Sequence, residues 1–139
     1  MIVVDTSVIY ALLDRNDRNH GQAAEWYLAS TPTLATTPLI LAEVDHLAGT
    51  RAGPGAQTAF RQDVVAGAYE ISWWSRAANE SVEIAERYDG LGVGLADASL
   101  VALAARLNVV DIATFDERHF RAMRPAKGGN TFRLLPSDQ

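Results

Sequence analysis

The sequence contains no cysteine, and this absence removes several classes of protein at once. Disulfide frameworks, thiolate zinc sites and cysteine nucleophiles are all excluded. No apolar run approaches the length of about 18 residues that a membrane-spanning helix needs. The first residues, MIVVDTS, lack the basic region of a secretory signal. We therefore expect a cytoplasmic protein with no membrane partner.

Basic residues are also scarce. Twelve Lys and Arg stand against 17 Asp and Glu, for a net charge of -5, and Lys127 is the sole lysine. This balance argues mildly against a nucleic-acid binder, which usually has a basic surface. A metal site would weaken that argument, because bound cations reverse the local charge. With 139 residues, of which 48% are hydrophobic, the chain is expected to form one globular domain over residues 1–139.

Short apolar segments alternate with longer helical patterns along the chain. Strands are expected at residues 1–4, 33–36, 69–73 and 131–135, with another ending at Thr114. Helices are expected at 8–13, 20–29, 38–48 and 57–66, after Ser75 up to about residue 88, and from just before Asp97 to about 107. A loop is expected at 49–56. This alternation predicts an α/β domain, in which helices flank both faces of a mostly parallel central sheet.

Two carboxylates occupy unexpected places in the segment from Gly90 to Phe120. Asp97 lies in the first turn of a helix that is apolar almost all round, on the same stripe as Val101. A carboxylate on an apolar face costs several kcal/mol unless something pairs with it. Asp116 follows a buried strand, so it is expected at the carboxyl edge of the sheet, where open α/β folds bind their ligands. The two acids are predicted to converge there.

Two further acids repeat this pattern. Asp5 closes the first strand, and taken alone it is as well explained as a helix N-cap. Glu43 lies between Leu39 and Leu47 on an apolar stripe of its helix. Because the same anomaly recurs at four positions, a purely structural interpretation becomes less attractive.

Four carboxylates at one sheet edge repel one another unless cations join them. Oxygen ligands without cysteine or a histidine pair favour hard cations such as Mg²⁺ or Mn²⁺. Two such ions about 3.5–4 Å apart can hold both the attacking and the leaving oxygen of a phosphoryl transfer. Hydrolysis of a phosphodiester is therefore the favoured reaction class.

Four segments carry a family resemblance: VVDTSVIYALLD, TTPLILAEV, GLADASLVALAARL and IATFDERHF. In this order, and over nearly the whole chain, they resemble a PIN-domain ribonuclease, and more narrowly a VapC-type toxin of type II toxin–antitoxin pairs. The resemblance implies a Mg²⁺-dependent endoribonuclease, with Mn²⁺ as an alternative, that inhibits translation and growth. It also implies an RNA substrate, a homodimer, and a VapB-type antitoxin that covers the active-site groove. The residues it assigns to catalysis and metal binding are Asp5, Glu43, Asp97 and Asp116, with Thr6, Ser7 or Thr114 as polar support.

Other functions fit the sequence less well. A phosphoreceiver module needs a lysine after its last core strand, and the lone Lys127 lies in a loop with proline and glycine. A phosphatase with an aspartate nucleophile would have a second acid where Ser7 stands. A non-catalytic acidic binding module or scaffold stays open as the alternative to the nuclease.

A metal-free ribonuclease would need paired histidines, whereas the three histidines here are scattered. His119, within DERHF, is interpreted as a local surface or packing residue. Four arginines are candidates for contacts with flanking phosphates, although a solvated surface charge is the preferred interpretation of each: Arg15, Arg18, Arg118 and Arg121.

Overall fold

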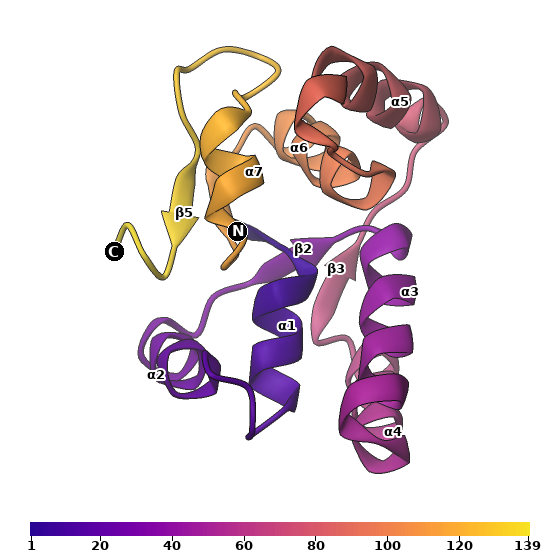
Figure 1. Cartoon of the computed structure of the whole chain (residues 1–139), viewed down its shortest axis with the longest axis vertical. Coiled ribbons are helices and arrows are strands. Elements are labelled where there is room, and N and C mark those ends of the chain that lie inside the picture. Colours follow the sequence, from indigo (N-terminus) through magenta and orange to yellow (C-terminus); the bar gives the residue numbers. More distant parts are fainter.

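The computed structural model describes residues 1–139, and a five-stranded sheet lies at its centre (Figure 1). Each strand has three residues: β1 Ile2–Val4, β2 Leu34–Thr36, β3 Tyr69–Ile71, β4 Asp111–Ala113 and β5 Arg133–Leu135. The strand order is β3-β2-β1-β4-β5, and every neighbouring pair is parallel. The predicted parallel sheet is thus confirmed, although the strands expected at 1–4, 33–36, 69–73 and 131–135 are all shorter than expected.

Seven α-helices connect and cover the strands. They are α1 Thr6–Leu13, α2 His20–Ser30, α3 Pro38–Leu47, α4 Pro54–Val65, α5 Ala77–Arg87, α6 Leu95–Leu107 and α7 Glu117–Ala122. A π-helical turn, η1 (Ala48–Ala52), follows α3, and a 3-10 turn, η2 (Asp89–Leu91), precedes α6. The predicted loop at 49–56 is therefore wrong. Pro54 occupies the first turn of α4, where its missing N–H costs nothing, so α4 begins before residue 57.

The helices lie on both faces of the sheet, as predicted. The chain passes from β1 to β2 to β3 in one direction, then returns to β4 and continues to β5 in the other. Right-handed crossovers then place α1 to α4 on one face and α5 to α7 on the opposite face. Figure 1 shows these two groups in the lower and upper halves of the view.

Helix α6 contains the longest uninterrupted run of buried residues of any helix in the fold. Every residue from Ala98 to Ala104 is buried, because α6 packs on β1 on one side and on α5 on another. The Ser99 hydroxyl lies 2.8 Å from that of Thr37, which precedes α3, and this hydrogen bond ties the starts of α3 and α6 together. The first turn of α6 is thereby fixed near the carboxyl edge of the sheet.

This edge holds the topological switch point of the fold. Helix α1 leaves β1 toward one face, whereas α7 leaves the adjacent β4 toward the other. Such divergent connections leave a crevice outside the carboxyl ends of the two strands, which is where α/β proteins bind ligands. No helix in the structure is both long and apolar enough to cross a membrane.

Candidate metal centre at the carboxyl edge of the sheet

An open pocket lies at this switch point, and all four predicted acids line it. They reach it from the ends of β1 and β4, from α3 and from α6. The lining residues are Asp5, Thr6, Ser7, Tyr10, Asp17, Asn19, Glu43, Leu47, Arg51, Asp97 and Asp116. The pocket therefore gathers five carboxylates around a single basic side chain.

Asp5 is buried at the end of β1, with 3% of its surface exposed. Asp5 occupies the N-cap position of α1, as the structural interpretation predicted, but its side chain makes no capping hydrogen bond. Its Oδ2 instead accepts hydrogen bonds from the hydroxyls of Ser7 and Thr114, each at 2.8 Å. Burial raises the pKa of Asp5, and these two hydrogen bonds oppose that rise by stabilising the carboxylate.

The same two hydroxyls also hold the loop that follows β4. Ser7 Oγ accepts a hydrogen bond from the Phe115 N–H at 2.9 Å, and Thr114 Oγ1 accepts one from the Asp116 N–H at 2.9 Å. Each hydroxyl thus donates to Asp5 and accepts from the backbone beside Asp116. This network fixes the position of Asp116 relative to Asp5, since Thr114 is fully buried and cannot shift without breaking both bonds.

Asp97 reaches the pocket from the first turn of α6, and its side chain is only 18% exposed. Its pKa rises to about 7, first because burial disfavours the charged form and second because Asp5 and Asp116 are negative neighbours. His119 opposes this rise. The carboxylate that the sequence places on an apolar helix is therefore unfavourable in its charged form in the folded protein.

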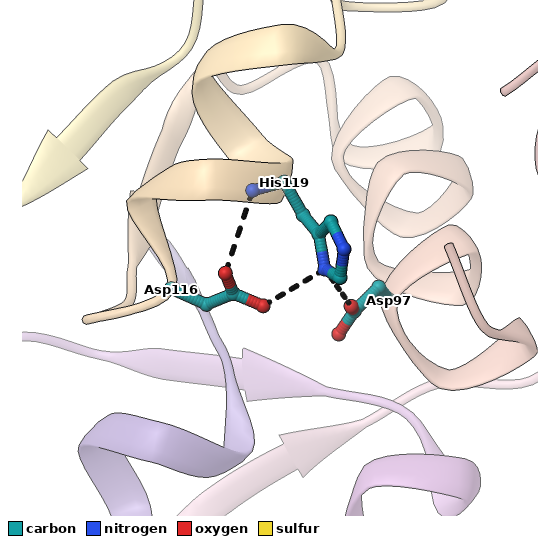
Figure 2. Close-up of side chains that lie close together, drawn as sticks. All are labelled: Asp97, Asp116 and His119. Atoms are coloured by element: carbon teal, nitrogen blue, oxygen red, sulfur yellow. Dashed lines mark hydrogen bonds and ion pairs between the residues drawn. The ribbon is translucent and has the colours of Figure 1, made fainter. Parts of the chain in front are cut away.

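His119 lies within this group, and its interpretation as a local surface or packing residue is wrong. Its Nδ1 is 3.0 Å from Asp116 Oδ2 and 3.3 Å from Asp97 Oδ2, and Figure 2 shows the ring between the two carboxylates. Asp116 caps α7 by accepting a hydrogen bond from the His119 N–H. A signal was present in the sequence: Asp116 and His119 are three positions apart, a spacing that brings them together at the start of a helix.

Glu43 lines the pocket from α3, but it is exposed rather than part of a buried stripe. The buried residues of α3 are Ile40 and Val44, so the face that packs on the core is rotated by about one residue from the predicted one. Glu43 is therefore a solvent-exposed residue of the pocket lining, whereas Asp5 is buried.

Arg51 is the one basic side chain of the pocket. It makes no ion pair, and none of the four arginines considered from the sequence lines the pocket. Arg121, for example, is held by Glu117 and Asp138, each at 2.7 Å. The sequence carries no signal for Arg51, because residue 51 lies in η1, within the segment 49–56 whose composition predicts a loop.

The donor atoms of the pocket suit a divalent cation. Ligand atoms of Asp97, Asp116 and His119 lie within 4.8 Å of one another. Thr6 also lines the pocket, and its Oγ1 is the one buried side-chain polar atom without a hydrogen-bond partner. Buried polar atoms are almost always paired, so this unpaired hydroxyl is available to hydrogen-bond a ligand or a water molecule.

Comparison with known proteins then assigns the fold to a family. A family model described as the PIN domain matches residues 2–124. The chain belongs to the PIN-domain family. This PIN domain is 35% identical over 136 residues to Ribonuclease VapC26 of Mycobacterium tuberculosis, an alignment that covers 97% of the chain and 100% of the relative. The predicted resemblance is thereby confirmed.

Two solved structures share the fold of this PIN domain. The first is VapC20 of Mycobacterium tuberculosis, described as a toxin that cleaves the sarcin–ricin loop. It has a TM-score of 0.78 and 24% identity, over 84% of this chain and 90% of that one. The second is a toxin–antitoxin complex from Klebsiella pneumoniae, with a TM-score of 0.63 and 21% identity, over 90% of this chain and 94% of that one.

Proposed function

We propose that this PIN domain is a metal-dependent endoribonuclease and the toxin of a type II toxin–antitoxin pair. The observation that carries the proposal is the convergence of Asp5, Glu43, Asp97 and Asp116 on one pocket at the switch point of the sheet. The full-length similarity to a protein named as a VapC ribonuclease supports the same reaction.

In this proposal Asp5, Asp97 and Asp116 hold Mg²⁺ or, alternatively, Mn²⁺, and Glu43 completes the site from α3. A bound divalent cation supplies positive charge to the phosphate and makes a water molecule easier to deprotonate. Ser7 and Thr114 keep the Asp5 carboxylate in one orientation through their hydrogen bonds. Such preorganisation matters because displacements of a catalytic group by about 1 Å can cost roughly 10²-fold in rate.

Arg51 is proposed to bind a phosphate that flanks the one being cleaved. It has no acidic partner in the protein, and it lies on the pocket wall beside Tyr10 and Leu47. A guanidinium group binds phosphate through two parallel hydrogen bonds, so one arginine can position the backbone of an RNA strand. The products are expected to carry 5′-phosphate and 3′-hydroxyl ends.

The proposed partners follow from the toxin assignment. They are an RNA substrate, a second copy of the chain in a homodimer, and a VapB-type antitoxin that covers the pocket. Cleavage of RNA by the free toxin would inhibit translation and growth, and the antitoxin would prevent it. The Klebsiella pneumoniae complex, which shares this fold, supports an antitoxin as a partner.

Cleavage of total bacterial RNA tests the proposal. Wild type and Asp97→Asn, purified in parallel, are incubated with the RNA in Mg²⁺ and in EDTA, and the new 5′ ends are mapped by sequencing. Discrete cuts that need both Mg²⁺ and Asp97 would support the nuclease and identify its target. A folded wild-type protein that makes no cuts with Mg²⁺ or Mn²⁺ would instead favour the alternative, a non-catalytic acidic binding module.

A further inference from the structure

His119 places a ring nitrogen between two of the proposed cation ligands. Its Nδ1 is 3.0 Å from Asp116 Oδ2 and 3.3 Å from Asp97 Oδ2 (Figure 2). The imidazole is largely buried, with 21% of its side chain exposed. Three elements fix this position: α7 carries His119, α6 carries Asp97, and the loop after β4 carries Asp116.

The other ring nitrogen determines the tautomer. His119 Nε2 lies 3.2 Å from the backbone carbonyl of Leu91, in η2. A carbonyl oxygen only accepts hydrogen bonds, so Nε2 must carry the hydrogen. In the neutral ring Nδ1 then presents a lone pair toward the two carboxylates. Because ionised carboxylates are also acceptors, a neutral ring is repelled here, and the positive charge that removes the repulsion is either a proton on Nδ1 or a bound cation.

The spacing of the three groups suits a shared metal ion. Adjacent ligands of an octahedral ion with bonds of about 2.1 Å lie about 3.0 Å apart. The two distances from Nδ1, 3.0 and 3.3 Å, are close to this value. The Leu91 carbonyl accepts a hydrogen bond from Nε2, the ring nitrogen farther from the acids. Backbone carbonyls commonly make this hydrogen bond to metal-bound histidines and so fix the orientation of the ring.

A second observation points independently to a ligand in this pocket. Thr6 Oγ1 is buried without a hydrogen-bond partner, and Thr6 lines the pocket together with Asp97 and Asp116. An unpaired buried hydroxyl is destabilising, and a hydrogen bond to a water molecule of the cation's hydration shell would remove this cost.

We propose that His119 Nδ1 binds the divalent cation directly, together with Asp97 and Asp116, and biases the centre toward Mn²⁺ over Mg²⁺. The inference rests on the proposed function for the presence of the cation, and adds a nitrogen to an all-oxygen site. Mg²⁺ prefers oxygen ligands, whereas imidazole suits transition-metal ions. His119 is thus the residue that determines metal preference.

Binding of Mn²⁺ to the full chain without RNA tests this inference. Pulsed electron paramagnetic resonance should detect coupling between bound Mn²⁺ and a ¹⁴N nucleus in the wild type, and no coupling in His119→Ala or His119→Gln. Calorimetric titration should show that His119→Ala lowers the Mn²⁺ affinity by tenfold or more, on the order of the 10–100-fold losses seen at metal sites, and lowers the Mg²⁺ affinity less. His46→Ala, at an exposed position of α3 outside the pocket, is the matched control and should behave as wild type.

The wild-type spectrum alone can overturn the inference, so the test does not depend on the stability of the variants. Bound Mn²⁺ without nitrogen coupling would show that His119 is only a charged neighbour of the acids, and would leave the proposed nuclease intact. Tighter Mn²⁺ binding by His119→Ala would show that the imidazole competes with the cation. A folded wild type that binds neither Mn²⁺ nor Mg²⁺ would overturn the proposed metal-dependent function together with this inference.

Discussion

Replacing Asp97 by asparagine should stabilise the metal-free protein at neutral and higher pH. The pKa of Asp97 rises from 3.8 to about 7 in the fold, because the carboxylate is buried and has Asp5 and Asp116 as neighbours. The folded state therefore binds more protons than the unfolded state between these two values. Stability then falls as the pH rises from about 4 to about 7, and stays lower above that range. Asparagine has nearly the same shape but carries no charge, so it escapes this penalty.

The penalty is large on the scale of protein stability. At about 1.4 kcal/mol for each pH unit between the two pKa values, it reaches about 4 kcal/mol once both states are deprotonated. This figure is an upper limit, since the side chain is 18% exposed and solvent screens part of the repulsion. For a chain of this size, a gain of that order raises Tm by on the order of 10 °C.

Thermal and urea unfolding of wild type and Asp97→Asn in EDTA would measure the effect at about pH 4 and about pH 8. The variant should be clearly more stable at the higher pH and nearly equal to wild type at the lower one. Saturating Mg²⁺ should narrow the difference at the higher pH, because a ligand at about 100 times its Kd stabilises the wild type by about 2.7 kcal/mol and the variant by less.

Asp45→Asn is the matched control. Asp45 forms an exposed ion pair with Arg61 at 2.7 Å, and its pKa is lowered by that hydrogen bond, so removing its charge should not stabilise the protein. A variant Asp97→Asn that gains no stability at about pH 8, or gains as much at about pH 4, would refute the reasoning that the pocket acids destabilise the fold.

Three further substitutions test other parts of the site. Thr114→Val removes the hydroxyl that joins Asp5 to the Asp116 N–H. The substitution should lower the free energy of unfolding, measured by urea titration, by about 1–3 kcal/mol, and an unchanged urea midpoint would contradict this role. Arg51→Ala should weaken RNA binding and reduce the slope of log K against log salt by about 0.7, whereas Arg15→Ala, outside the pocket, should leave the slope unchanged. Equal slopes for both variants would exclude Arg51 as a phosphate ligand. Glu43→Gln should leave stability within about 0.5 kcal/mol of wild type because the residue is exposed, while initial cleavage rates fall by on the order of 10²-fold; full activity would remove Glu43 from the site.

The placement of the central acids follows from features that a sequence displays. Asp5 and Asp116 each lie just beyond a short apolar strand, and the carboxyl ends of parallel strands meet at one edge of a sheet. Asp97 was detectable because a charge in an otherwise apolar helix demands an explanation. These signals are local in the sequence. The parallel topology of the sheet brings the three acids to the same pocket.

The surrounding residues were harder to predict because their positions depend on tertiary structure. His119 meets Asp97 across 22 residues of sequence, through the packing of the short α7 against the start of α6. Arg51 reaches the pocket because η1 continues α3 past residue 47. One side of this continuous helix therefore carries Glu43, Leu47 and Arg51, which are spaced four residues apart. From the sequence, the loop beginning at Gly49 is predicted to end the helix before Arg51.

The chemistry of the cleaved ends tests the central claim most directly, namely that a metal centre built on Asp5 hydrolyses RNA. One purified RNA containing a mapped site is cut by wild type and by Asp5→Asn, and the ends are identified by phosphatase and ligation assays. The account predicts 5′-phosphate and 3′-hydroxyl ends, formed only with a divalent cation and absent with Asp5→Asn. Ends with a 5′-hydroxyl and a cyclic phosphate, or equal cleavage by the variant or in EDTA, would contradict it.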